Sequence, residues 1–600
     1  MSKFKWRDLL QLNSKNDSFK SPLSILCHID VNSFYAQVEQ VRCGYTKDDP
    51  VVCVQWQSLI AVSYAAKQYG ITRMDTIQNA MEKCDKLIPI HTAVFKKGED
   101  FWQYHDGCGS WNSDPSKKLL VEQYKVSLDP YRRESRKIFK IFTEYFDLAE
   151  KASVDEVFLD LGRLCLKKLM FDDELQWQSI RYLREKFFDG QYDLDDNLPP
   201  LPSELHSIEF IGDTFNPHNK PINDWDDVLF ALGSHITQHV RKEIECNLGY
   251  TTSCGIARTK NICKLASDFK KPNAQTIIRN QCVEDFLDCG AFEITSFWTL
   301  GGNLGHELTP ILNLPQKDTI KYIREKWPDL KSLKEFLESQ PLADDIGRKD
   351  VLTEKLFLSV RGSYLIPLTS QTMVKSMTSN KNMRNNACSN LNDCISWLEV
   401  FAGELSGRVS ELEQEYNKRV IPKTISVTSR NRHGDTHSKS APFVSRNSKI
   451  TSHEIQRHGV RLMTELDSKF SSSRQYYPLQ NINMSLSNFE VLANNKTVLD
   501  MVGGKNHTSK DSSPQSNSYV DSLRCFTCHE TFENDKLYQE HMDFEFAQKL
   551  SQKLNYEPNS DRKSTGEKRL LEKSDSKLPK KYQKKGKTSS SRNILTYFSK

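Results

Sequence analysis

The sequence predicts an α+β protein built from several domains. Short β-prone runs alternate with amphipathic helical segments from residue 23 to about residue 280, and a mostly helical stretch follows to residue 368. A long helix and alternating apolar segments then occupy residues 370–507. Beyond them the chain turns polar and loses periodicity apart from a compact island at 525–550, which is typical of a disordered tail with short modules.

The first β-prone run is Leu23–Ile29, and it is followed directly by the carboxylate of Asp30. A hairpin-like stretch at residues 151–160 carries Asp155 and Glu156 at its tip. Three oxygen donors that converge at strand edges could hold two divalent cations for phosphoryl chemistry. The alternative is a polar turn, where acidic dipeptides are common, and spacing alone does not separate the two interpretations.

The segment 189–227 is rich in Asp, Pro and Asn, and it predicts a solvated surface insertion. A helix resumes after it and is expected to stop at Gly249. Its apolar side chains recur at four-residue spacing: Leu232, Ile236, Val240 and Ile244.

Two features follow in the second half of the chain. Residues 300–305 form either a glycine-rich loop between helices or a turn whose backbone N–H groups approach a DNA phosphate. An amphipathic helix over 398–412 precedes alternating segments at 424–428 and 482–486, which predicts a separate small α+β domain.

Composition limits the class of protein. The 600 residues suggest roughly four domains. Hydrophobic residues make up 37% of the chain, and no apolar run approaches the roughly 20 residues that span a bilayer, so we expect no membrane contact. The first residues lack the apolar region of a secretory signal, and the fifteen cysteines fit thiols or metal ligands in a reducing compartment. A net charge of +5 permits a nucleic-acid partner without requiring one.

Cations gather in two places that suit a polyphosphate. Tyr64, Lys67 and Arg73 lie close together in sequence, and Lys270-Lys271 follows a helix that Pro272 should end. An ordinary amphipathic helix with solvated cations, and a helix end with favourable cations, remain alternatives.

Six short motifs occur in order within residues 23–507: Asp30…Phe34-Tyr35, Ser63-Tyr64…Arg73, Tyr131-Arg132…Ser135, Ser153-Val-Asp155-Glu156, Lys260-Asn261…Lys264-Leu-Ala and Lys271-Pro272-Asn273-Ala-Gln275. In order and spacing this set resembles the Y-family DNA polymerases, and within that family the eta-type enzymes of fungi. The resemblance implies a translesion DNA polymerase that acts on primer-template DNA and deoxynucleoside triphosphates.

The resemblance also implies a right-hand architecture with a disordered tail. Its parts would be a discontinuous palm at 1–33 and 98–278 with the insertion at 189–227, fingers at 34–97, a helical thumb at 279–368, a little finger at 369–507 and a tail at 508–600.

Asp30, Asp155 and Glu156 are the catalytic residues that the resemblance implies. With the backbone carbonyl of Val31 they would bind two Mg²⁺ ions, and Mn²⁺ is expected to substitute. One ion would lower the pKa of the primer 3′-hydroxyl and align it on the α-phosphate, and the other would neutralise the β- and γ-phosphates and the departing pyrophosphate.

The same resemblance implies a nucleotide site. Tyr35 would be the steric gate that leaves no room for a ribose 2′-hydroxyl. Gln55 and Ile60 would touch the nascent base pair and its template base, in a cleft wide enough for an ultraviolet-induced pyrimidine dimer. An arginine is also found in the family at the position of Lys67, which puts bidentate binding in doubt there. The expected nucleotide contacts are Phe34, Tyr35, Tyr64, Lys67, Arg73 and Lys271.

The tail contains a module at 521–552 that resembles the ubiquitin-binding zinc finger of these polymerases. Its candidate Zn²⁺ ligands are Cys525, Cys528, His541 and Glu545, and Asp543 is the expected ubiquitin contact. Glu545 stands where the pattern requires a second histidine, because structural sites of this kind normally use Cys and His. A zinc-free amphipathic helix with two chance cysteines therefore stays open.

Two further signals in the tail concern location and recruitment. A lysine cluster at 580–587 predicts either a nuclear localisation signal or a solvating run, and we expect a nuclear protein. The box at 591–598, with Ile594, Tyr597 and Phe598, resembles motifs that dock in an apolar pocket of the sliding clamp PCNA. Ser591 stands where glutamine is usual.

Two other functions compete with this interpretation. One is a Y-family polymerase with a different lesion preference. The other is a catalytically silent scaffold that joins PCNA to ubiquitin, against which the intact Asp30, Asp155 and Glu156 argue.

Overall fold

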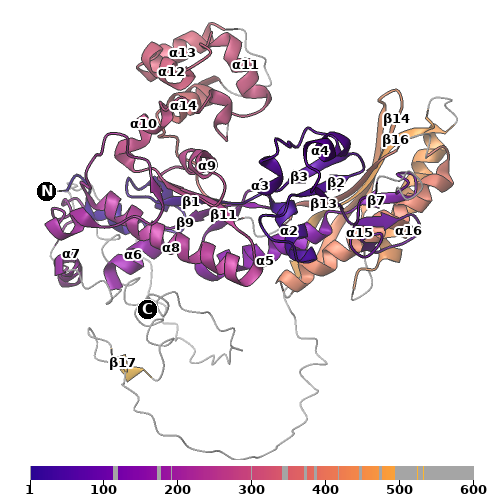
Figure 1. Ribbon diagram of the computed structural model, residues 1–600, viewed down its shortest axis with the longest axis horizontal. Helices are drawn as coiled ribbons and strands as arrows, with labels where there is room; N and C mark the ends of the chain where they lie inside the picture. Colours follow the sequence, from indigo (N-terminus) through magenta and orange to yellow (C-terminus); the bar gives the residue numbers. More distant parts are fainter. Residues whose placement is uncertain are drawn as a thin grey trace, which may run out of the picture.

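The computed structural model describes residues 2–112, 119–171, 178–190, 192–298, 300–340, 349–370, 374–383, 388–416, 418–444, 449–471 and 476–492, together with two short strands between residues 523 and 532. Helices and sheets both occur throughout these ranges, which confirms the expected mixed fold class (Figure 1). None of the described helices is both long enough and apolar enough to cross a membrane.

A six-stranded sheet lies in the body of the molecule, in the order β10-β12-β11-β1-β9-β8 (Figure 1). The central strand β1 runs antiparallel to both neighbours, β11 and β9, whereas β12 runs parallel to β11 and β10. The strands are β1 (Leu26–Val31), β8 (Ala149–Lys151), β9 (Glu156–Asp160), β10 (Asp213–Thr214), β11 (Thr252–Ala257) and β12 (Gln275–Ile277).

Both faces of this sheet are buried, so β1 reads as an almost continuous apolar run. Cys27 and Ile29 pack into one apolar cluster with α6 and α8, whereas Leu26 packs into another with α9. Because side chains alternate along a strand, Asp30 shares the α9 face with Leu26. The helices of this body are α1 (Trp6–Gln11), α5 (Asp129–Tyr145), α6 (Gly162–Phe171), α7 (Gln178–Asp189), α8 (Trp225–Leu248) and α9 (Lys260–Phe269).

Glycine determines two features of this body. A Cβ on Gly255 of β11 would lie 2.0 Å from the carbonyl oxygen of Cys263, so only glycine lets α9 pack this close to the sheet. Helix α8 ends at Gly249, whose φ of 77° is left-handed, which confirms the predicted stop.

A smaller three-stranded sheet follows β1 in the chain, in the order β3-β2-β4. A bulge between Cys53 and Val54 shifts the register of its first hairpin, and Ile60 lies in the shifted part. Its elements are α2 (Phe34–Cys43), β2 (Val51–Gln55), β3 (Ser58–Val62), α3 (Tyr64–Lys67), α4 (Ile77–Lys83) and β4 (Ile88–His91).

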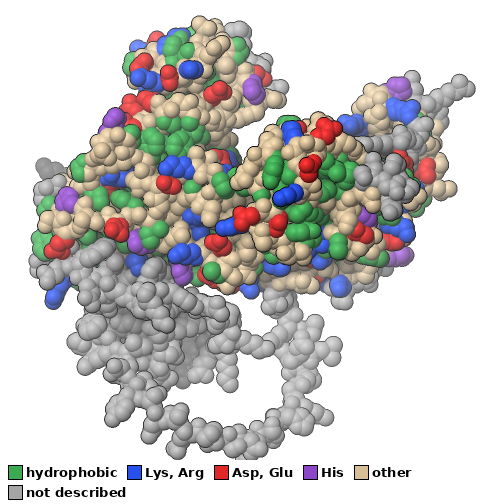
Figure 2. Space-filling model, viewed as in Figure 1, with side chains coloured by type: hydrophobic (Ala, Val, Ile, Leu, Met, Phe, Trp, Pro, Cys, Tyr) green, Lys and Arg blue, Asp and Glu red, His purple; other side chains and the backbone are tan. Residues whose placement is uncertain are grey.

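The described residues between 283 and 359 are mostly helical, as the sequence predicts, and form a separate lobe (Figure 1). In the space-filling view the surface is notched between this lobe and the part that carries α3 and α4 (Figure 2). The glycine-rich turn leads into α11, with Gly302 at φ 70° before its first residue. The helices are α10 (Val283–Leu287), α11 (Asn303–Ile311), α12 (Thr319–Lys326), α13 (Leu330–Glu338) and α14 (Lys349–Ser359).

The C-terminal unit, residues 374–492, is a four-stranded sheet in the order β13-β16-β14-β15 with two helices against it. The predicted helix and both alternating segments are confirmed. A short three-stranded sheet, β6-β5-β7, lies beside this unit (Figure 1). The elements are β5 (Val94–Lys96), β6 (Trp102–Gln103), β7 (Tyr124–Val126), β13 (Ser376–Asn382), α15 (Leu391–Tyr416), β14 (Arg419–Asn431), β15 (Thr436–Pro442), α16 (Ser452–Phe470) and β16 (Leu479–Leu492).

The expectation that 189–227 is only a solvated insertion is wrong for part of that segment. Leu198 and Leu205 are buried in the main core, and Asp213–Thr214 adds the edge strand β10 to the central sheet. Trp225 already belongs to helix α8. Short apolar anchors within a polar segment are enough to attach it to the core.

In the tail, the structure describes only the strands β17 (Leu523–Arg524) and β18 (Thr531–Phe532), which pair antiparallel. The remaining tail predictions lie outside the described residues: Cys525, Cys528, His541, Asp543, Glu545, Ile594, Tyr597 and Phe598.

Candidate active site

Strand pairing brings the three predicted carboxylates together. Antiparallel β1 and β9 place Asp30 directly opposite Glu156. The backbone N–H of Val31 donates to the carbonyl oxygen of Asp155 at 3.0 Å, so the tip of the β8-β9 hairpin is tied to the end of β1. Oxygen donors therefore gather at one end of the central strands.

Ser153 shapes the turn that presents two of these carboxylates. Its hydroxyl donates to Oδ1 of Asp155 at 2.5 Å and accepts from the backbone N–H groups of Asp155 and Glu156. A serine that bonds the backbone two and three residues ahead stabilises a tight turn. The direction of the Asp155 carboxylate is thereby set within the hairpin itself.

Lysines from α9 and the loop after it neutralise two of the three carboxylates. Lys271 Nζ lies 2.9 Å from Asp30 Oδ1 and 2.6 Å from Asp268 Oδ1, and Lys264 Nζ lies 2.7 Å from Glu156 Oε1. As the side chains lie, no group of three or more His, Cys, Asp or Glu among the described residues is arranged to hold a metal ion. The positive charge at the site belongs to the two ammonium groups.

The carboxylates differ in how readily they ionise. Burial raises the pKa of Asp30 to about 7, with Asp155 and Glu156 adding to the rise and Lys271 opposing it. His28 and Lys264 hold the pKa of Glu156 below its ordinary value. His28 Nε2 is 3.9 Å from Glu156 Oε2, too far for a hydrogen bond, so the 2.7 Å contact with Lys264 is the stronger one.

This donor set fits a hard divalent cation in its chemistry. All three side chains offer carboxylate oxygens, which Mg²⁺ prefers, and they crowd negative charge at one point of the sheet. The raised pKa of Asp30 reflects mainly its burial, which disfavours the ionised carboxylate. A bound dication would stabilise the ionised form.

Helix α3 adds a lysine and a tyrosine from the small sheet. Lys67 Nζ lies 3.9 Å from the centre of the Tyr64 ring. Burial and repulsion from Lys271 lower the pKa of Lys67, so the two ammonium groups are near enough to interact electrostatically. Ser63, whose hydroxyl accepts from Ala66 N–H, caps the helix and fixes its start. Two converging cations of this kind suit a polyphosphate.

The other predicted nucleotide residues are spread over neighbouring elements. Phe34 is buried at the start of α2 against Tyr250, and Gln55 ends β2. Ile60 is half-buried against the main core, whereas Arg73 is exposed in a turn. Among the described contacts, Gln55, Ile60 and Arg73 make no hydrogen bond or ion pair with the three carboxylates.

The ring of Tyr35 is stacked on Tyr131, with 4.1 Å between ring centres and 13° between planes. The Tyr131 hydroxyl donates to Oε1 of Glu39 at 2.7 Å, and the Tyr104 hydroxyl donates to the same oxygen at 2.8 Å. Arg42 completes the arrangement by donating to Oε2 at 2.7 Å. A buried, fully bonded carboxylate therefore fixes the ring on which Tyr35 rests.

Glu39 was not identified as a site residue from the sequence, although its position in the sequence indicates a buried glutamate. It lies four residues after Tyr35, on the same face of α2, and a glutamate on a buried helix face needs partners. For His28 the chain offers no such spacing, because its partner Ser267 lies on α9, 239 residues away.

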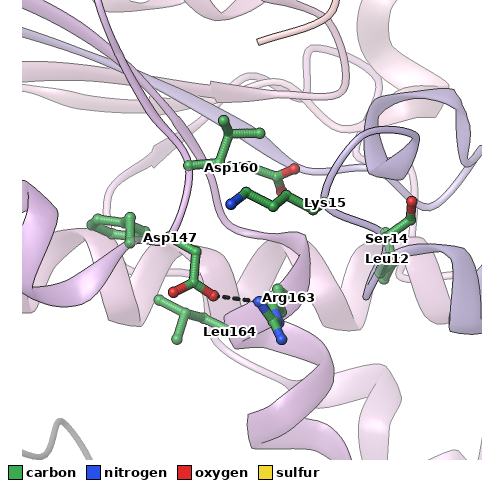
Figure 3. A pocket seen from close by; sticks show the side chains of 9 residues that line it. Leu12, Ser14, Lys15, Asp147, Asp160, Arg163 and Leu164 are labelled. Atoms are coloured by element: carbon green, nitrogen blue, oxygen red, sulfur yellow. Dashed lines mark hydrogen bonds and ion pairs between the residues drawn. The ribbon is translucent and has the colours of Figure 1, made fainter. Parts of the chain in front are cut away.

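A separate small pocket lies at the other end of β9 (Figure 3). Asp160 and Lys15 line it, and Arg163 pairs with Asp147 at 2.6 Å on its wall. Its volume of about 20 Å³ holds little more than one water molecule, so it is not a substrate site.

Comparison with known proteins defines the class. Residues 29–268 match the impB/mucB/samB family, and residues 374–500 match the C-terminal domain of that family. The chain belongs to this family, the Y-family of DNA polymerases, and is an enzyme of that class.

Individual relatives narrow the comparison to the eta type. The chain is 50% identical to DNA polymerase eta of Saccharomyces cerevisiae over 632 aligned positions that cover 100% of both proteins. It is 32% identical to N-acetyltransferase eso1 of Schizosaccharomyces pombe, over 81% of this chain and 51% of that protein. It is 26% identical to DNA polymerase eta of Arabidopsis thaliana, over 70% of this chain and 55% of that protein. The sequence-based resemblance to fungal eta-type enzymes is confirmed.

Proposed function

We propose that this protein is a translesion polymerase that adds deoxynucleotides to a primer 3′-hydroxyl and inserts them opposite ultraviolet-induced pyrimidine dimers. The observation that carries the proposal is the register of β1 and β9, which sets Asp30 opposite Glu156. The backbone hydrogen bond from Val31 to Asp155 brings the third carboxylate beside them. Membership of a DNA polymerase family supports primer-template DNA and deoxynucleoside triphosphates as the substrates.

The metal proposal assigns two Mg²⁺ ions, with Mn²⁺ as a substitute, to Asp30, Asp155, Glu156 and the carbonyl of Val31. When bound, such ions lower the pKa of the attacking hydroxyl and neutralise the phosphates of the nucleotide. Lys271 and Lys264 must first release the carboxylates with which they pair. Lys271 then becomes free to bind the triphosphate together with Lys67, Tyr64 and Arg73.

The right-hand architecture is proposed from the same resemblance. The palm is assigned to 1–33 and 98–278, and the six-stranded sheet supports it. The fingers are assigned to 34–97, the helical thumb to 279–368 and the little finger to 369–507. The surface notch between the thumb and fingers supports a place for the template (Figure 2). Gln55 and Ile60 are the proposed contacts with the nascent base pair and its template base.

Removing two carboxylates tests the catalytic proposal. The Asp155→Ala/Glu156→Ala variant should lower primer extension with Mg²⁺ by more than about 10³-fold, because the transferring phosphoryl group loses its electrostatic support. Asp213→Asn is the matched control, since its carboxylate is half-exposed and pairs only with Lys270 among its described ion pairs. Normal extension by the double variant, or none by the wild type, would favour a silent scaffold.

Replacing Tyr35 tests the proposed gate. Tyr35→Ala removes the ring that rests on Tyr131, so we expect the preference for deoxy- over ribonucleotides, measured as the ratio of kcat/KM values, to fall about 10-fold or more. Tyr45→Ala, which removes an exposed ring after α2, should leave the ratio unchanged. An unchanged ratio in the Tyr35 variant would place the gate elsewhere.

Lesion preference separates the eta type from other members of the family. Primer extension opposite a thymine dimer should approach the rate on undamaged template. Extension opposite a bulky minor-groove guanine adduct should stall. The reverse pattern would contradict the eta assignment and favour the Y-family alternative.

The tail proposals concern recruitment in the nucleus. The module at 521–552 is proposed to bind ubiquitin through Asp543, with Zn²⁺ on Cys525, Cys528, His541 and Glu545 as a further prediction. The box at 591–598 is proposed to bind PCNA, and the lysine cluster at 580–587 to direct nuclear import. Paired aromatics in a polar tail support a docking role, because apolar pockets on a partner can bury them.

Reciprocal variants test the tail. Tyr597→Ala/Phe598→Ala should abolish capture of purified PCNA while leaving ubiquitin binding intact, since it removes only the apolar anchors. Asp543→Ala should do the opposite, so each variant is the control for the other. Retention of both activities by both variants in a pull-down assay would contradict these proposals.

A further inference from the structure

The C-terminal unit shares its core with residues that precede it by about 300 positions. Phe95 of β5 belongs to the same apolar cluster as Trp397 and Phe401 of α15, and Trp102 packs against that cluster. Figure 1 shows β7 beside α15. The unit is therefore packed against residues from the first part of the chain and not only connected to them along the polypeptide.

Four charged side chains are buried at this contact. Lys125 Nζ lies 2.7 Å from Glu404 Oε2, and Arg408 Nε lies 2.9 Å from Asp129 Oδ1. Arg408 also pairs with Glu404 and donates to the carbonyl oxygen of Thr378 at 2.9 Å. The exposed fractions are 7% for Lys125, 4% for Asp129, 2% for Glu404 and 8% for Arg408. We call these four side chains the charge lock.

The charge lock has two positive and two negative groups, and each half contributes one of each sign; the partly exposed Arg132 also pairs with Asp129. Removing one partner from such a buried pair leaves an uncompensated charge in a medium of low dielectric constant, which is strongly unfavourable. Apolar contacts tolerate sliding, whereas hydrogen-bonded charges require specific distances and directions. The charge lock therefore selects one orientation of the C-terminal unit.

Backbone contacts at the same interface limit its spacing. A Cβ on Gly403 of α15 would lie 2.3 Å from the carbonyl oxygen of Asp100, whereas a Cβ on Gly407 would meet open space. Lys381 of β13 donates to the carbonyl oxygens of Val121 and Tyr124, both at 2.8 Å. Helix α15 and strand β13 are thus held against the segment around β5–β7 at close range.

One end of the charge lock approaches the proposed nucleotide site. Asp129 begins α5 and also accepts from Arg132 at 2.6 Å. Two residues further along α5, Tyr131 carries the ring on which Tyr35 is stacked. The same helix start therefore contacts the C-terminal unit and supports the candidate site.

We propose that the charge lock holds the C-terminal unit in a single orientation before DNA binds, and that Glu404 and Arg408 are thereby positioning residues for the primer-template. The second half of this statement rests on the proposed polymerase function. If the orientation is fixed beforehand, DNA binding does not have to order the two halves of the binding surface, and the free energy that such ordering would cost is saved. Its loss should weaken DNA binding more than the chemical step.

Hydrogen exchange of the DNA-free, full-length protein tests the orientation, with peptides that cover 119–129 and 400–412. Glu404→Gln removes one negative charge and should speed exchange in both peptides by about 100-fold, while its KM for primer-template rises about 10-fold and kcat changes less than about 3-fold. Arg133→Gln is the matched control, because this half-exposed arginine crosses the same interface, where it also lies over the Trp102 ring, and its loss leaves Glu411 paired with Arg136; both readouts should change far less than in Glu404→Gln.

A compensated variant guards against simple misfolding. Lys125→Met/Glu404→Gln removes one charge of each sign, so it should restore much of the slow exchange and the low KM that Glu404→Gln loses. Unchanged exchange in Glu404→Gln, or no recovery in the double variant, would overturn the charge lock. Faster exchange with an unchanged KM would overturn the positioning role. The exchange measurement does not need polymerase activity, so failure of the proposed function would be recognised separately.

Gly403→Ala and Gly407→Ala probe the spacing by the same method. The first should speed exchange in both peptides, because its methyl group meets the Asp100 backbone, and the second should not. Equal behaviour of the two variants would contradict the close approach.

Discussion

The antiparallel pairing of β1 with β9 is the constraint on which the candidate site depends. It sets Asp30 opposite Glu156 and ties Val31 to Asp155, so one register places all three carboxylates. A shift by one residue would turn Asp30 toward α6 and α8, away from Lys271. Gly255 lets α9 lie against the same face, which brings the lysines to the carboxylates.

Two lysines compensate part of the negative charge at this site, and one of them, Lys271, is also proposed to bind the nucleotide. Lys271 pairs with Asp30 and Lys264 with Glu156, which lessens the repulsion among three neighbouring acids. Burial nevertheless raises the pKa of Asp30 to about 7, because it disfavours the ionised carboxylate more than Lys271 favours it. Further positive charge beside Asp30 would lower that pKa.

Helix α5 joins two parts of the molecule that the sequence separates widely. Near its start, Tyr131 supports the ring of Tyr35 and bonds to the buried Glu39. Asp129 from the same helix pairs with Arg408 of α15 in the C-terminal unit. One rigid element therefore links the buried Glu39 to the buried charges at the contact with the C-terminal unit.

The sequence by itself determined the fold class, the helix that stops at Gly249, the strand that reaches Asp30 and the hairpin that carries Asp155 and Glu156, because local periodicity and turn chemistry specify such elements. Its ordered motifs also identified the family. The sequence did not predict how 189–227 attaches to the core. A single buried leucine, Leu198, and the two-residue strand β10 give no periodic pattern. Only the tertiary structure decided which lysine pairs with which carboxylate. It also decided which charged side chains are buried at the contact with α15. Those contacts join residues more than a hundred positions apart, and no local pattern specifies a distance across the fold.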